Sequence, residues 1–395
     1  MLTSLAIIFL AGMLSAYLFG KIKLPSLLGM LIVGIAAGPF AFDILDESIL
    51  LVSPDLRQLA LVIILSRVGL TLDLADLKKV GRPAFLMCWL PATLEIVGVV
   101  LLAPLLLGIS RLDAAIIGAV VAAVSPAVIV PRMLGLMERG YGKRKSIPQL
   151  LMAGASADDI YVIVLFSSFI AMATGNGVGM AQLLQIPVSV IAGGLVGAGV
   201  GLALVAGFKR FHIRDTAKVM IFLSLSFLLI SFEKLEIMPF SGLVAIVCVG
   251  LVILKQYEVL AKRLSGKFSK LWVAAEILLF VLVGATVDIR YALAAGPAIV
   301  GLVVGALVFR MFGVWLCLLG SSLNRGERLF CMMAYIPKAT VQAAIGAIPL
   351  GMGLPCGQLV LTVAVISILI TAPLGALAID LSYERLLADD LIKPK

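Results

Sequence analysis

The chain has 395 residues, of which 62% are hydrophobic and 13% charged, with a formal net charge of +9 and a mean hydropathy of +1.18. A soluble domain carries about 25% charged residues, so this composition excludes a water-soluble fold and requires a lipid bilayer as the surrounding solvent. Because membrane topology accounts for the positive charge, as argued below, we expect membrane lipid and no nucleic acid as a partner.

Apolar stretches of roughly 20 residues recur along the whole chain and predict an all-α membrane protein with about thirteen transmembrane helices. The first stretch has no basic flank and no clear cleavage site, so we expect it to be retained rather than removed as a signal peptide. The expected spans are 2–20, 24–41, 57–72, 83–108, 113–135, 148–172, 183–207, 216–232, 240–256, 270–287, 292–319, 328–350 and 357–378.

The lysine and arginine residues concentrate in alternate loops. With the N-terminus outside and the C-terminus cytoplasmic, the inside segments hold about six basic residues for each one outside. This bias supports the helix count and the orientation. After the last span only 379–395 remains, which we interpret as a short cytoplasmic tail. From this small size we expect a bacterial inner membrane.

Two of the expected spans are interrupted by proline. Pro126 and Pro131 fall within 113–135, and Pro337 falls within 328–350. Proline removes a backbone donor, and non-helical backbone at membrane depth is tolerated only where it lines a cavity or is buried in protein. Two broken helices in matching places favour inverted repeats in which the broken helices cross, with an ion site between them.

Asp158 and Asp159 lie within the span 148–172, with apolar residues on both sides. Apolar flanks argue against a solvated loop, and charged side chains at bilayer depth are expensive unless they serve a function. Two neighbouring carboxylates resist simultaneous ionisation, so a cation and a proton can compete for them. That competition is what antiport through one site requires.

Glu95 precedes the break at Pro126, and Arg310 precedes the break at Pro337 at a similar distance along the chain. The helices that carry them run in opposite directions in the expected topology. An acid and a base in equivalent helices of inverted repeats can meet at the pseudo-twofold axis, so we expect a Glu95–Arg310 ion pair. The alternative is that each has another partner, such as Asp159 for Arg310.

The remaining charges at membrane depth admit more than one interpretation. Lys338, directly after the second break, can compensate the exposed carbonyls of a half-helix, or it can take part in proton coupling. Arg67 and Glu276 can pair within a scaffold or lie near a water-filled vestibule. His212, the only histidine, lies in a basic loop and is expected to be solvated.

These residues resemble the monovalent cation/proton antiporter superfamily, and within it the NHA-type sodium/hydrogen exchangers. The resemblance covers most of the chain in order. It rests on IILSRVGL at 63–70 with Asp73 following, VSPAVIVP at 124–131, the Asp158-Asp159 pair, and PKATVQAA at 337–344.

The resemblance implies the sodium/proton antiporter fold, a homodimer, and a mobile core domain beside a scaffold domain. It also implies that Asp159 is the main carrier of the cation and the proton, with Asp158 beside it, and that Glu95 and Arg310 form a core salt bridge. Some relatives have lysine in place of Arg310. Arginine stays charged at physiological pH, so its presence favours electroneutral exchange.

We therefore predict a secondary transporter, not an enzyme, that exchanges Na⁺ or Li⁺ for H⁺ by alternating access and needs no cofactor beyond the transported ions. Oxygen atoms near Ser125, Ser156 and Thr340 are expected to complete the cation site at Asp158 and Asp159. The expected parts are a core at 83–175 and 291–378, and a scaffold and dimer domain at 1–82 and 176–290.

Other functions remain open at this stage. A K⁺/H⁺ antiporter uses the same chemistry, and a sodium-coupled symporter can use a similar inverted-repeat fold. A symporter for an organic substrate needs an aromatic or polar cavity lining, which the sequence does not supply. An intramembrane aspartyl protease needs aspartates on two facing helices, whereas Asp158 and Asp159 are adjacent in one.

Overall fold

The computed structural model describes residues 1–71, 81–175, 180–211, 213–233 and 240–387, and every regular element among them is a helix. Within this part of the chain, nine helices are long and apolar enough to cross a membrane. Three shorter apolar helices accompany them, at Ser26–Ala37, Gly242–Gln256 and Thr340–Gly351. An all-helical, multi-pass membrane fold is therefore confirmed, while the count of thirteen spans stays a prediction.

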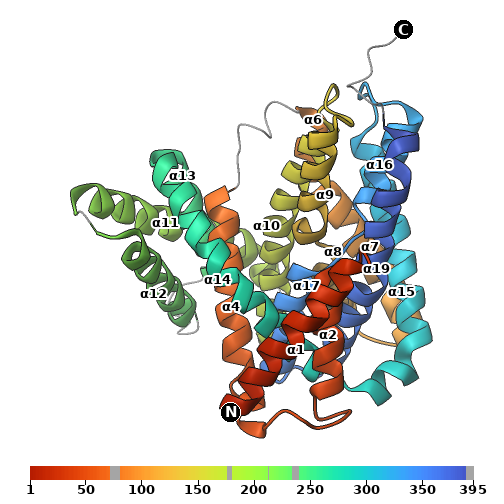
Figure 1. Cartoon of the computed structure of the whole chain (residues 1–395), viewed down its shortest axis with the longest axis horizontal. Helices are drawn as coiled ribbons and strands as arrows, with labels where there is room; N and C mark the ends of the chain where they lie inside the picture. The colour runs from red at the N-terminus through yellow and green to blue at the C-terminus, as the bar shows by residue number, and fades with distance from the viewer. Residues whose placement is uncertain (72–80, 176–179, 212, 234–239, 388–395) are drawn as a thin grey trace. The chain divides into compact units, whose positions relative to one another are not determined.

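The helices divide into two compact units by their contacts, and the first comprises residues 1–54, 73–162 and 280–395. Within it, α7 packs along α15 and α8, and α19 contacts α8, α15 and α16. The helices of this unit, most of them labelled in Figure 1, are α1 (Leu2–Lys21), α2 (Ser26–Ala37), α3 (Glu47–Leu51), α6 (Arg82–Met87), α7 (Leu90–Leu107), α8 (Arg111–Ala122), α9 (Pro126–Arg139), α15 (Ile289–Cys317), α16 (Arg325–Ala334), α17 (Thr340–Ile345), α18 (Ile348–Gly351) and α19 (Gly357–Leu386).

The second unit comprises residues 55–72 and 163–279. In it α13 packs against α11 and α12. Its helices are α4 (Ser53–Thr71), α11 (Met180–Arg210), α12 (Asp215–Glu233) and α13 (Gly242–Gln256), and α10 (Ile147–Thr174) and α14 (Glu258–Ala285) contribute residues to both units. The division by contacts groups residues 1–54 with residues 83–162, unlike the expected domain boundaries. The roles assigned to a core and a scaffold stay predictions.

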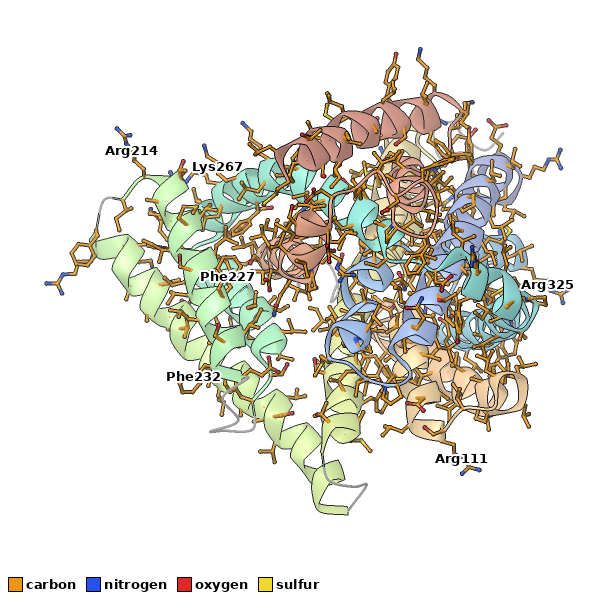
Figure 2. All side chains as sticks on the ribbon, turned by 90° about the horizontal axis from the view of Figure 1, so that it is seen from below. Arg111, Arg214, Phe227, Phe232, Lys267 and Arg325 are labelled. Carbon is orange, nitrogen blue, oxygen red and sulfur yellow. The ribbon has the colours of Figure 1, made fainter. Side chains whose placement is uncertain are left out.

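Large apolar side chains face outward from the helices, as expected where lipid replaces water. On α12, Phe227 and Phe232 are 38% and 47% exposed and point away from the ribbon in Figure 2. Arg214, directly before α12, and Lys267, in the polar first part of α14, are by contrast exposed charges (Figure 2). Apolar side chains along the helix and charges at its ends match a bilayer with its two polar surfaces.

Local sequence signals explain most helix boundaries. Ser110 accepts a hydrogen bond from the backbone N–H of Asp113 at the start of α8, and Asp288 accepts bonds from Arg290 and Tyr291 at the start of α15. Such side-chain acceptors satisfy backbone donors that the first turn of a helix leaves free. At the C-terminal ends, Gly108 and Gly140 have φ of 66° and 88°, a left-handed conformation that favours glycine.

Two expectations about helix boundaries are wrong. Pro131 does not break a helix, because it lies inside α9, where a proline removes a single backbone hydrogen bond while its fixed φ remains helical. Helix α14 begins at Glu258 rather than at residue 270. Its first turns are polar and carry a Glu258–Lys262 ion pair of 2.5 Å, so hydropathy identified only the apolar part of a longer helix.

Glycines allow α2 to approach the end of α14 within the first unit. A Cβ atom at Gly34 would overlap the carbonyl of Val281, and one at Gly284 would lie 2.9 Å from the backbone nitrogen of Ile35. Close backbone approach across small residues is a main source of helix association in membranes, where the hydrophobic effect contributes little to the stability of helix–helix contacts.

We expect Gly34→Ala to lower the apparent melting temperature of the purified protein, because overpacking a tight contact costs about 1–3 kcal/mol. Thermal unfolding in detergent, followed by tryptophan fluorescence, measures this. Gly199→Ala in α11 is the matched control, since a Cβ there meets no atom within 4 Å. Equal melting temperatures for the two variants would show that the α2–α14 approach does not need glycine.

Candidate functional site

Two interruptions of helical backbone meet in the first unit. Helix α8 ends at Ala122 and α9 begins at Pro126, so residues 123–125 are extended. Helix α16 ends at Ala334 and α17 begins at Thr340. The backbone N–H of Ser125 donates to the carbonyl of Pro337 over 2.8 Å. The breaks expected at Pro126 and Pro337 therefore lie side by side, and each supplies a partner for the backbone of the other.

The end of α8 exposes carbonyl groups that lack a helical partner, as every helix C-terminus does. Side chains from later in the chain satisfy three of them in succession. The amide nitrogen of Gln342 donates to Ala123 over 2.8 Å and to Val121 over 3.4 Å, and Arg310 Nη1 donates to Ala122. These donors let a helix end inside the protein without leaving buried acceptors unpaired.

Arg310, on α15, is 1% exposed, and its guanidinium donates hydrogen bonds to several groups at once. Its Nη1 donates to Glu95 Oε2 and its Nη2 to Asp158 Oδ2, both over 2.8 Å. Its Nε donates to the carbonyl of Tyr335 over 2.9 Å. The structure thus brings Arg310 to Glu95, as expected from the repeat argument. Its second acidic partner is Asp158, not Asp159, the alternative that the sequence left open.

Lys338 forms an ion pair with Glu95, and its two expected roles, compensation of half-helix carbonyls and proton coupling, stay predictions. Its Nζ lies 2.7 and 2.8 Å from the two carboxylate oxygens of Glu95, and its backbone N–H donates to Thr371 Oγ1 over 3.0 Å. Gln342 and Arg310 already donate to the carbonyls at the end of α8. The ammonium group of Lys338 instead neutralises a buried carboxylate, which is costly to leave without a partner.

The two aspartates of α10 have different surroundings. Asp158 is fully buried, and its Oδ2 accepts bonds from Arg310 and from the backbone N–H of Val124 over 3.0 Å. Asp159 is 3% exposed, and its Oδ1 has no hydrogen-bond partner among the described residues. The Oδ1 of Asp158 is also unpartnered there. The carboxylate of Asp158 is thus held in place by hydrogen bonds, and that of Asp159 is buried with one oxygen that has no hydrogen-bond donor beside it.

The expected neighbouring oxygens differ in availability. Ser125 is 1% exposed, and its hydroxyl has no partner within the described part of the chain. Thr340 is 4% exposed at the start of α17. Ser156 donates its hydroxyl to the carbonyl of Met152 over 3.0 Å, within its own helix. Oxygen-only ligands suit a small alkali cation, and of the three hydroxyls that of Ser156 is the one already bonded within its own helix.

Sequence reasoning missed Gln342, Tyr335 and Thr371 as members of this site. Gln342 carried a usable signal, because an uncharged polar side chain within an apolar, broken helix also needs a partner. Nothing in the sequence distinguishes Tyr335 and Thr371 as site residues, since tyrosine and threonine are common in membrane helices. Among the other expectations, Asp73 and His212 lie outside the described residues.

Comparison with known proteins places this arrangement in a family. Residues 5–380 match the family described as sodium/hydrogen exchanger, transmembrane. The chain belongs to the sodium/hydrogen exchanger family. Human sodium/hydrogen exchanger 9B2 is 34% identical to this exchanger over 98% of the chain and 75% of the relative. The human 9B1 protein is 30% identical over 92% of the chain and 73% of the relative.

The fold of the exchanger also matches a solved structure. The sodium proton antiporter MjNhaP1 from Methanocaldococcus jannaschii, at pH 8, superposes with a TM-score of 0.83 and covers 98% of both chains at 19% identity. This likeness shows the antiporter fold. Together with the family match, it agrees with the expectation of a transporter.

One expectation is overturned by these comparisons. The relatives include human, mouse and Xenopus tropicalis proteins, so the bacterial inner membrane inferred from size is withdrawn. Size could not decide the matter, because a transmembrane bundle of given helix number has the same length in any membrane.

We expect Glu95→Gln to destabilise the exchanger, because it removes the acceptor that Arg310 and Lys338 share. Removing one partner of a buried ion pair costs about 3–5 kcal/mol. The double variant Glu95→Gln/Lys338→Met also removes the unpaired ammonium and is expected to regain part of the lost melting temperature. Thermal unfolding in detergent at pH 7 compares them.

Glu138→Gln is the control for this comparison, since Glu138 is exposed on α9 and its charge has no buried partner to lose. Its melting temperature should match that of the native chain. A double variant no more stable than Glu95→Gln would contradict the shared ion pair.

Proposed function

We propose that this chain is a secondary transporter that exchanges Na⁺ or Li⁺ for H⁺ by alternating access, with Asp159 as the carboxylate that binds each in turn. The observation that carries this proposal is the pairing of the buried charges. Glu95 and Asp158 have basic partners at 2.7–2.8 Å, while Asp159 has an unpartnered buried oxygen. A buried carboxylate without a partner needs either a proton or a cation.

The charges also support exchange of one ion for one proton. Three acidic side chains, Glu95, Asp158 and Asp159, share the site with two basic ones, Arg310 and Lys338. With every group ionised, the site has one excess negative charge. A single monovalent cation or a single proton neutralises it, so the site carries the same charge in both directions. We therefore propose electroneutral exchange.

The movement follows from the predicted repeats. We propose about thirteen transmembrane helices with an inverted repeat in which α7–α9 and α15–α17 correspond. The Ser125–Pro337 contact and the packing of α7 on α15 support this correspondence. A core at 83–175 and 291–378 would then move against a scaffold at 1–82 and 176–290 and expose Asp159 to one side at a time.

Three finer features belong to the same proposal. The resemblance to NHA-type exchangers supports a homodimer, formed through the scaffold. The distribution of basic residues supports an N-terminus outside and a cytoplasmic C-terminus. The relatives are sodium/hydrogen exchangers and the structural neighbour is a sodium proton antiporter, which supports Na⁺ as the cation, and the resemblance to NHA-type exchangers supports Li⁺ beside it. A K⁺/H⁺ antiporter is the alternative within the same chemistry.

The test uses purified protein in liposomes with an imposed pH gradient and a trapped pH dye. Addition of Na⁺ or Li⁺ should drive proton flux in the native chain, and Asp159→Asn should abolish it, because an amide cannot exchange a proton for a cation. Flux with K⁺ alone would favour the alternative cation. A native rate in Asp159→Asn would disprove the role of Asp159.

Electroneutrality gives a separate expectation. An imposed potassium diffusion potential of about 100 mV should change the Na⁺-driven flux by less than about twofold, because moving a net charge would add about 2.3 kcal/mol per charge. Liposomes with Asp159→Asn report the leak at the same potential. A flux that follows the sign of the potential would falsify one-for-one exchange.

A further inference from the structure

Tyr335 lies at the second helix break and touches the charged network without being charged itself. It directly follows α16, two residues before Pro337, and is 1% exposed. Its carbonyl accepts the Nε of Arg310 over 2.9 Å, and the guanidinium carbon of Arg310 lies 5.3 Å from the centre of its ring. One residue therefore contacts Arg310 through both its backbone and its ring.

The two contacts constrain different motions of Arg310. The carbonyl bond holds the Nε edge of the guanidinium, and a cation over a ring face is attracted to the face itself. With Nε held, Nη1 and Nη2 point to Glu95 and Asp158. A guanidinium is planar, so fixing one edge and one face determines where the remaining donors lie.

The far end of Tyr335 reaches the helix that carries the aspartates. A Cβ atom at Gly154 would overlap the hydroxyl oxygen of Tyr335, and it would lie 3.4 Å from the Cζ atom of that ring. Gly154 precedes Asp158 by four residues on α10, so the two share a face one turn apart. Tyr335 thus spans the distance between Arg310 and the turn of α10 that leads to Asp158.

Filling of the hydrophobic core is the simpler explanation for a buried tyrosine. Tyr335 does belong to the apolar cluster that includes Leu151, Ala155 and Cys331. Yet its hydroxyl has no hydrogen-bond partner among the described residues, and burying a hydroxyl without a partner is unfavourable. Core filling gains nothing from the hydroxyl, and it does not require a ring face 5.3 Å from the guanidinium carbon of Arg310, so packing alone does not account for the arrangement.

We propose that Tyr335 is a positioning residue of the exchanger: its ring and carbonyl fix Arg310, and the far edge of its ring, packed against Gly154, fixes the distance from Arg310 to the Asp158–Asp159 turn. It touches neither the cation nor the proton. The proposal rests on the proposed function, because the affinity of the site for Na⁺ is its readout. Loosening Arg310 displaces Asp158 and so weakens the oxygen site beside it.

The test compares Tyr335→Leu with Tyr335→Phe in the liposome assay. Tyr335→Leu keeps apolar volume but removes the ring face, and it should raise the KM for Na⁺ about tenfold or more. Tyr335→Phe keeps the ring and should stay within about twofold of the native KM. A purely space-filling role would lower the melting temperature of Tyr335→Leu and leave its KM unchanged, and that result overturns the proposal.

A second pair of variants tests the contact with α10 and does not depend on Tyr335→Leu being folded. Gly154→Ala should raise the KM for Na⁺, because its methyl group displaces the Tyr335 hydroxyl. Adding Tyr335→Phe removes that oxygen and should restore most of the native KM. Gly135→Ala on α9 is the control, since a Cβ there meets no atom within 4 Å.

The outcomes separate this inference from the function on which it rests. If the native chain shows no cation-driven proton flux, the proposed function fails. If the native chain exchanges ions and Gly154→Ala has a native KM, or Tyr335→Phe does not rescue it, the positioning role of Tyr335 fails and the function stands.

Discussion

A guanidinium buried in a membrane protein must find partners for its charge and its donors, and Arg310 imposes this constraint on its surroundings. Its partners are two carboxylates, from α7 and α10, and two carbonyls, from the last residue of α8 and from the residue that follows α16. Each lies on a different segment of the chain. The position of the aspartates, the paths of both broken helices and the packing of α7 on α15 therefore depend on the same side chain.

The broken helices are costly on their own, because each interruption leaves buried carbonyl and amide groups without partners. The structure resolves this by letting the two breaks satisfy each other. Ser125 bonds to Pro337 directly, and Gln342 reaches back from α17 to the end of α8. Non-helical backbone at membrane depth is tolerated where protein groups satisfy it, and the two breaks meet this condition through each other.

The buried acidic and basic side chains of this network are nearly all paired, and Asp159 is the exception. Lys338 and Arg310 form ion pairs with Glu95 and Asp158, and no ion pair to Asp159 is seen in the described part of the chain. The proposal that Asp159 carries the exchanged ion rests on this difference between the three acids.

The sequence by itself determined the membrane class, the breaks at Pro126 and Pro337, and the short set of charges from which the site is built. It could do so because these signals do not depend on the tertiary contacts. Apolar length and proline act on the local backbone, and a charge within the bilayer is unfavourable in any fold unless it is paired or hydrated. Only the tertiary structure decided that Asp158 rather than Asp159 binds Arg310, that Lys338 neutralises Glu95, and that Gln342 and Tyr335 belong to the site. These are contacts between segments far apart in the chain, and adjacent aspartates that differ by about 100° around a helix carry no sequence signal of which faces the guanidinium.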